Sequence, residues 1–375
     1  MRNPGLVELG VSRDEYKKIV QRSLEPHRFE ILEKKESWIR RCEGWMKDLL
    51  ASGEQIDPVR IQPSLELVTT PAQHEIWRYC RLLGSIPFNR GCGRLIRYLL
   101  RDNGHEGRPL MGVIALSSPV LINKPRDEWV GWEYPRDVEL KRRKLLCCME
   151  LSVSMAMPPY NHLTAGKMIC MAVLSSEVRL DYFKKFAQHV TPTGLSEGRL
   201  GLITTTSLYG SSVQYNRIKV KDRTAYRVVG YTSGFGNSHV TEKEFAAMEL
   251  YLKEAGKPIA KGWGTGRSYR LRVYTAYSRL RHGAPMAPSH NHPRSVYVAP
   301  LAANTKEFLR GRAEQLDYYD LSCAQLVDLW RRRWLEPRAA RSDVLERFRM
   351  AGANNRPLSS ELQSYREKVS PAAAA

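Results

Sequence analysis

Residues 145–207 constrain the fold of this chain more than any other part of the sequence. Apolar side chains alternate with Glu, Ser and Ala through residues 149–157, which is the two-residue period of a half-buried strand. Two prolines end this strand, and a polar turn leads into residues 163–186, whose Ala, Met, Leu and Lys predict a long helix. The β-branched run at 200–207 predicts a second strand. Strand, helix and strand in this order form a βαβ unit, so we expect two parallel strands in a wound sheet.

The carboxyl ends of these two strands predict a ligand-sized crevice, because ligands of open α/β sheets bind outside such strand ends. Polar segments follow both predicted strands, one at 161–162 and one at 209–212. We expect the crevice to be lined by four polar side chains: Asn161, His162, Lys167 and His239.

The remaining periodicity indicates a mixed α/β protein. Residues 110–117 form a continuous apolar run, which predicts a central strand beside 148–157, and residues 225–232 predict another strand. A capping box at 12–15 opens a helical segment that extends to residue 50. We expect a central, mixed, partly parallel sheet with flanking helices. The predicted parts are a helical extension (1–55), an α/β core domain (56–255), a basic, aromatic-rich, helical region (256–350) and a disordered tail (351–375).

The glycines before the basic run 94–101 allow two interpretations. They resemble a phosphate-binding turn, but the complete spacing of a dinucleotide or phosphate loop is missing. The alternative is the start of a helix with a basic outer face.

The charge of the chain predicts a polyanionic partner. The sequence has 59 Lys and Arg against 39 Asp and Glu, which gives a formal net charge of +20. Such a surface attracts phosphates beyond contact distance, so nucleic acid, and DNA in particular, is the expected partner. A membrane partner is not expected, because the sequence has no run of 18 apolar residues. A solvated basic surface without a ligand stays open as the alternative.

Two parts of the chain carry the side chains that suit this partner. Residues 256–350 interleave basic side chains with Tyr and Trp, as nucleic-acid contacts do. Residues 208–220 combine hydroxyl and amide donors with cations, which suits phosphate and sugar oxygens, although a glycine-rich turn supporting the sheet would look similar. The expected nucleic-acid-binding residues are Tyr209, Ser211, Ser212, Gln214, Asn216, Arg217, Arg267, Arg270, Arg272, Arg331, Arg332 and Arg333.

Catalytic candidates are few. Asp127 and Glu150 would suit a metal-bound phosphoryl-transfer site or a general base, although an acid beside Arg126 is more often salt-bridged. The histidines at 290 and 292 lie between prolines, which favours an ordinary loop over a metal site. We therefore name no metal ligands, and both a divalent metal cofactor and enzymatic activity stay open.

The cysteines predict a reducing compartment. The seven cysteines include no CxxC pair, and the amino terminus lacks the apolar segment of a secretory signal. We expect a cytoplasmic protein.

The strings PPYNHLTAGK (158–167) and TTTSLYGSSVQYNR (204–217) resemble the DruA family, which is named for the Druantia anti-phage defence system. The resemblance extends over residues 60–350. It implies a prokaryotic defence or mobile-element protein that takes part in DNA transactions, with other subunits of a complex as partners. Metal-dependent nuclease or strand-transfer activity is an open extension of that function.

The succession of strand, proline turn, helix and strand also resembles the core of GNAT-type acetyltransferases. That family binds its cofactor pyrophosphate with an Arg/Gln-x-x-Gly-x-Gly/Ala loop, where this chain reads NHLTAGK at 161–167. Without the glycine pair, the backbone lacks the close approach that a pyrophosphate needs. The alternative function is a GNAT-like acyltransferase that uses acetyl-CoA.

Overall fold

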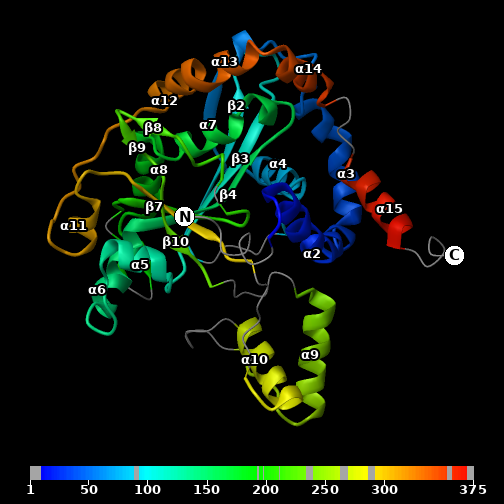
Figure 1. Ribbon diagram of the computed structural model, residues 1–375, viewed down its shortest axis with the longest axis vertical. Helices are drawn as coiled ribbons and strands as arrows, with labels where there is room; N and C mark the ends of the chain where they lie inside the picture. Colours follow the sequence, from blue (N-terminus) through cyan, green and yellow to red (C-terminus); the bar gives the residue numbers. More distant parts are fainter. Residues whose placement is uncertain are drawn as a thin grey trace.

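A seven-stranded mixed sheet forms the centre of the molecule, in the order β1-β2-β3-β4-β7-β11-β10 (Figure 1). The computed structural model describes residues 10–87, 93–191, 194–196, 198–210, 212–233, 240–261, 269–285, 292–352 and 357–369. Strands β4 and β7 are parallel and every other neighbouring pair is antiparallel, which confirms the predicted mixed, partly parallel sheet. The strands are β1 (Pro63–Leu67), β2 (Leu95–Asp102), β3 (Leu110–Ser117), β4 (Cys148–Ala156), β7 (Leu202–Ser207), β10 (Arg227–Tyr231) and β11 (Ser295–Pro300).

Helices cover both faces of this sheet. One face packs against α7 (Ala165–Ala172), α8 (Ser176–Phe186), α12 (Cys323–Trp330) and α14 (Ser342–Met350). The other face packs against α2 (Arg13–Glu33), α3 (Glu36–Met46), α4 (Pro71–Leu82), α5 (Lys124–Val130), α11 (Thr305–Leu309) and α15 (Leu358–Val369). The smaller elements are α6 (Val138–Lys144), α13 (Glu336–Ala339) and the strand pairs β5 (Val190–Thr191) with β6 (Gly194–Leu195), and β8 (Lys219–Val220) with β9 (Arg223–Thr224).

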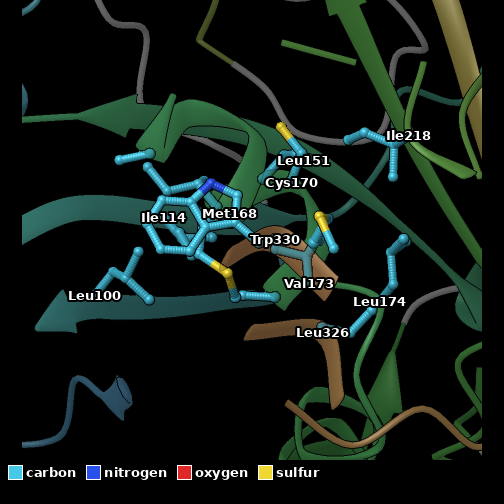
Figure 2. Packing of buried hydrophobic residues seen from close by; sticks show 14 of the residues in the cluster. Leu100, Ile114, Leu151, Met168, Cys170, Val173, Leu174, Ile218, Leu326 and Trp330 are labelled. Atoms are coloured by element: carbon cyan, nitrogen blue, oxygen red, sulfur yellow. The ribbon is translucent and has the colours of Figure 1, made fainter. Parts of the chain in front are cut away.

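The largest core lies under α7 and α12. Every residue of β3 is buried, as the continuous apolar run predicts. Figure 2 shows the indole of Trp330, from α12, among Leu100 and Ile114 of the sheet and Met168 of α7. Trp330 Nε1 also donates to the carbonyl oxygen of Thr164 at 3.2 Å, so one side chain fixes α12 to the start of α7.

Two local predictions were wrong. The segment 163–186 is not one helix, because Ser175 accepts a hydrogen bond from the amide of Val178 and starts α8 as a separate helix. The basic run after the glycines is strand β2 rather than a helix. Its side chains alternate between the two cores, with Leu99 in one and Tyr98 and Leu100 in the other, which is the two-residue period of a strand.

The structure also differs from the expected disordered tail. Residues 358–369 form α15, and its Leu358 and Leu362 are buried against the core that α2 and α3 share. The ring of Tyr365 stacks on Phe29 with a centroid separation of 3.8 Å. The segment is mostly polar, so its composition did not indicate that its few apolar side chains pack against the core. The domain boundaries themselves stay predictions.

Helices α9 (Glu242–Glu254) and α10 (Tyr269–His282) project from the sheet as a pair with its own small core (Figure 1). The amino terminus of α9 is held by Glu30 of α2, whose carboxylate accepts from the amides of Glu242 at 2.7 Å and Lys243 at 3.0 Å. Burial alone would raise the pKa of Glu30, but these hydrogen bonds and Lys34 hold the pKa below its ordinary value.

We expect Glu30→Gln to loosen the attachment of α9, because a neutral amide oxygen is a weaker acceptor than a carboxylate for helix amides. The amides of Glu242 and Lys243 should exchange faster with deuterium, and the free energy of unfolding should fall by about 1–2 kcal/mol. Since the folded pKa is the lower one, the stabilisation is complete above the ordinary carboxylate pKa and disappears as the pH falls through the folded value. Glu33→Gln, one turn further along α2, is the control. Unchanged exchange in Glu30→Gln would contradict the anchoring role.

Candidate nucleic-acid interface

The predicted crevice lies where β4 and β7 diverge. The two strands pair over only three residues, from Cys148 opposite Leu202 to Glu150 opposite Thr204. Beyond this point, side chains of the segment 212–217 contact both strands. The hydroxyl of buried Tyr215 lies 3.1 Å from the Ser154 hydroxyl on β4 and 3.3 Å from the Thr205 hydroxyl on β7.

Several predicted nucleic-acid residues hold this segment in place. Gln214 Nε2 donates to the carbonyl oxygen of Ser154 at 3.1 Å. The hydroxyl of Tyr297 accepts from the Ser212 amide at 2.9 Å and lies 3.3 Å from Asn216 Oδ1. In this structure the backbone amide of Ser212 and the side chains of Gln214 and Asn216 are therefore engaged with residues of β4 and β11.

Lys167 clamps the same segment from α7. Its Nζ donates to the carbonyl oxygens of Val213 and Asn216, both at 2.6 Å, and the residue is only 6% exposed. Burial lowers the pKa of Lys167 to about 8, and the positive charges of Arg217 and Arg333 add to this effect. The ammonium group thus lies in a field of other cations.

Several cations lie near the start of α7. Arg217, Arg332 and Arg333 are exposed, and the guanidinium of Arg338 donates to the carbonyl oxygen of His162 at 2.9 Å. We call Arg217, Arg332, Arg333 and Arg338 the α7 basic surface, and the buried ammonium of Lys167 lies next to it. The structure therefore brings together three segments that were predicted separately, around residues 161–167, 214–217 and 331–333.

The expected binding residues did not include Trp334, which the sequence places beside the three arginines, or Arg338, and both belong to this region. The Lys167 ammonium lies 5.3 Å from the centre of the Trp334 ring, and the Arg333 guanidinium lies 4.9 Å from it. The alternation of Trp and Arg around position 333 was the signal that could have found them. Their contacts depend on the π-helical turn at Arg331–Leu335, which local sequence does not predict.

The remaining crevice and arginine candidates play different parts. Asn161 is exposed beside this surface. Burial and the charges of Arg347 and Arg338 lower the pKa of His162, which favours its neutral form. Arg331 donates to the carbonyl oxygens of Ile61 and Val59, so it fixes the segment before β1.

Other predicted residues lie elsewhere. Tyr209 packs beside α2, with the Lys17 ammonium 5.8 Å from its ring. Arg270 and Arg272 lie on α10, away from α7, and Arg270 is paired with Glu242. Ser211, His239 and Arg267 are outside the described residues.

The structure offers no open carboxylate pair at Asp127 and Glu150. Asp127 Oδ1 accepts from Arg126 at 2.6 Å and Oδ2 accepts from Lys141 at 2.6 Å, so both oxygens are engaged. Burial raises the pKa of Glu150, while Arg126 and Arg294 act in the opposite direction. Among the residues that the structure describes, no group of three His, Cys, Asp or Glu side chains lies close enough to hold a metal ion.

Within the described ranges, no helix is long and apolar enough to cross a membrane.

Comparisons with known proteins agree with the strings at 158–167 and 204–217. A family model described as "Druantia protein DruA" matches residues 13–311. The Druantia protein DruA of Escherichia coli (strain UMEA 4076-1) is 31% identical over 298 residues, which cover 78% of this chain and 72% of that protein. No solved structure matches this chain.

We expect Lys167→Met to change how stability depends on pH. Because the folded pKa of about 8 is below the ordinary 10.5, the unfolded chain binds more protons between these values, and Lys167 makes stability rise with pH there. The contribution to the slope is at most about 1.4 kcal/mol per pH unit. Urea unfolding from pH 8 to 10 should show a smaller rise for Lys167→Met than for the parent or for the exposed control Lys219→Met. Parallel stability curves for all three proteins would disprove the depressed pKa.

Proposed function

Because the chain belongs to the DruA family, we propose that it acts in anti-phage defence as a DNA-binding protein, with the α7 basic surface as its contact. The convergence of three segments on this surface is the observation that carries the proposal. Arg217 comes from the crevice segment, Arg332 and Arg333 come from the turn after α12, and the buried Lys167 of α7 lies next to them. A related role in a mobile element would use the same surface.

The arrangement favours contact with phosphates over reading of bases. The ring of Trp334 lies near two cations, Lys167 and Arg333, and the side-chain amides of Gln214 and Asn216 are used within the protein. Exposed guanidinium groups remain, and these bind phosphate oxygens through paired N–H donors. We therefore propose binding that is largely independent of DNA sequence.

Catalysis on DNA is not part of this proposal. A metal-dependent nuclease or strand-transfer site built on Asp127 does not fit the structure, because Arg126 and Lys141 already occupy both oxygens of that carboxylate. We propose instead that any strand cleavage in the defence response is supplied by other subunits of a complex, with this chain contributing DNA contact.

The acyltransferase alternative has one observation in its favour, namely the single parallel pair β4–β7 in an otherwise antiparallel sheet, as in a GNAT-like core. Contacts of Tyr215 with both strands and of Gln214 with β4 count against an acetyl-CoA groove at this point. We therefore favour DNA binding over acyl transfer, since a shared core arrangement does not by itself imply a shared function.

We expect the triple change R217Q/R332Q/R333Q to weaken DNA binding by a similar factor on unrelated sequences, because phosphate contacts carry no sequence information. The slope of log affinity against log salt should become shallower by about 0.9 for each phosphate that the variant no longer neutralises. Fluorescence anisotropy with two unrelated 30-base-pair duplexes at several salt concentrations measures both quantities.

The matched control is K124Q/R136Q/R142Q, which removes three exposed positive charges from α5, α6 and the segment between them. It separates a local contact from the effect of net charge. Equal losses of affinity in the two triple variants would count against the α7 basic surface.

A further prediction separates the two functional classes. Isothermal calorimetry with acetyl-CoA should show no binding to the parent protein, because side chains of the segment 212–217 contact both β4 and β7. Tyr215→Gly, which removes one of these side chains, is the sensitive control for a latent groove. Micromolar binding of acetyl-CoA to the parent protein would favour the acyltransferase.

A further inference from the structure

We propose that the free end of the α9–α10 pair carries a second nucleic-acid contact, so that one chain holds two separate DNA segments. This inference rests on the proposed DNA-binding function and adds a second site to it.

The two helices of the pair run side by side in the same direction. Phe245 contacts Tyr269, and Tyr251, six residues further along α9, contacts Tyr277, eight residues further along α10. The carboxyl ends of both helices therefore lie at the same end of the pair. The opposite end is the one that Glu30 attaches to α2.

Positive charge gathers at the free end. Lys253, Arg279, Arg281 and His282 are exposed there, and Glu254 is the acid next to them on α9. Among the described residues, no ion pair joins Lys253, Arg279 or Arg281 to an acid, whereas Arg270 near the attached end is paired with Glu242. One cation at each carboxyl terminus would satisfy the helix dipoles, so the basic side chains of α10 exceed what helix stability needs.

Exposed aromatic surface accompanies these cations. Tyr251 is 39% exposed, and its ring meets the edge of Tyr277 at a centroid distance of 5.4 Å. Basic side chains beside tyrosines form the mixture that contacts nucleic-acid backbones and sugars. A polyanion is therefore the partner whose charge complements this end.

The position of the pair makes this contact separate from the first. Figure 1, in which the longest axis is vertical, places α12 and α13 at the top of the molecule and the α9–α10 pair at the bottom. The sheet and its covering helices lie between the two basic regions. A straight DNA segment lying across the α7 basic surface does not extend to Arg279 and Arg281, so these side chains are left for a second segment.

The experiment compares three triple variants of the intact chain: K253Q/R279Q/R281Q at the free end, R217Q/R332Q/R333Q at the α7 basic surface, and the charge-matched control K124Q/R136Q/R142Q. Bridging is measured as capture of a fluorescent 30-base-pair duplex by beads that carry an unlabelled duplex of the same length. Binding of one duplex is measured by anisotropy, and circular dichroism establishes that each variant is folded.

We expect the parent and the control to bridge, and the first two variants to lose bridging by about tenfold or more while each still binds a single duplex. If K253Q/R279Q/R281Q bridges two duplexes as well as the control does, the second contact is disproved. Bridging by a dimer that has one DNA site per chain would give this result. If the parent binds no duplex in either measurement, the proposed function itself fails, and the two failures are thereby distinguished.

Discussion

The hydrogen bonds that the Lys167 ammonium donates hold in place the segment on which the proposed DNA contact depends. These two bonds go to main-chain oxygens of residues 213 and 216, and side chains of the same segment contact both β4 and β7. A buried lysine is costly, and its pKa of about 8 records that cost. The clamp has two results. It holds the segment 213–216 against α7, and it keeps the exposed Arg217 near Arg333, since both cations act on the Lys167 ammonium.

Much of the fold was predictable from sequence, and the reason is periodicity. The run at 110–117 and the alternation at 149–157 identify their strands because each pattern has a single period and a clear face. The contacts of the segment 212–217 with β4 and β7 were not predictable. Nothing in the local sequence distinguishes a tyrosine that lines a groove from one, such as Tyr215, that is packed between two other tyrosines, Tyr226 and Tyr297. The candidate site residues stay predictions, and the parts that Ser212, Gln214 and Asn216 play in the structure depend on contacts across 60 to 85 positions.

The positive charges of the chain include buried arginines as well as exposed ones. Arg94 is buried and donates to the carbonyl oxygens of Leu146 and Leu145, and Arg126 is fully buried and donates to those of Val120 and Leu121. These guanidinium groups satisfy main-chain acceptors where irregular segments leave the sheet. They add to the net charge of +20 without adding to the field that a ligand meets at close range. Composition alone therefore does not distinguish the arginines that are buried from those that face solvent.

The docking of α15 on α2 has a consequence for the order in which the molecule can be completed during synthesis. Arg28 and Glu361, 333 positions apart, form a paired hydrogen-bonded contact beside the stacked rings of Phe29 and Tyr365. The first helices leave the ribosome long before the segment that covers them. Until translation reaches α15, part of the apolar side of α2 and α3 faces solvent, and a nascent chain in this state is a substrate for chaperones that bind exposed apolar surface. A ribosome that stalls before the codons of α15 would release a protein with its sheet formed and its amino-terminal helices uncovered.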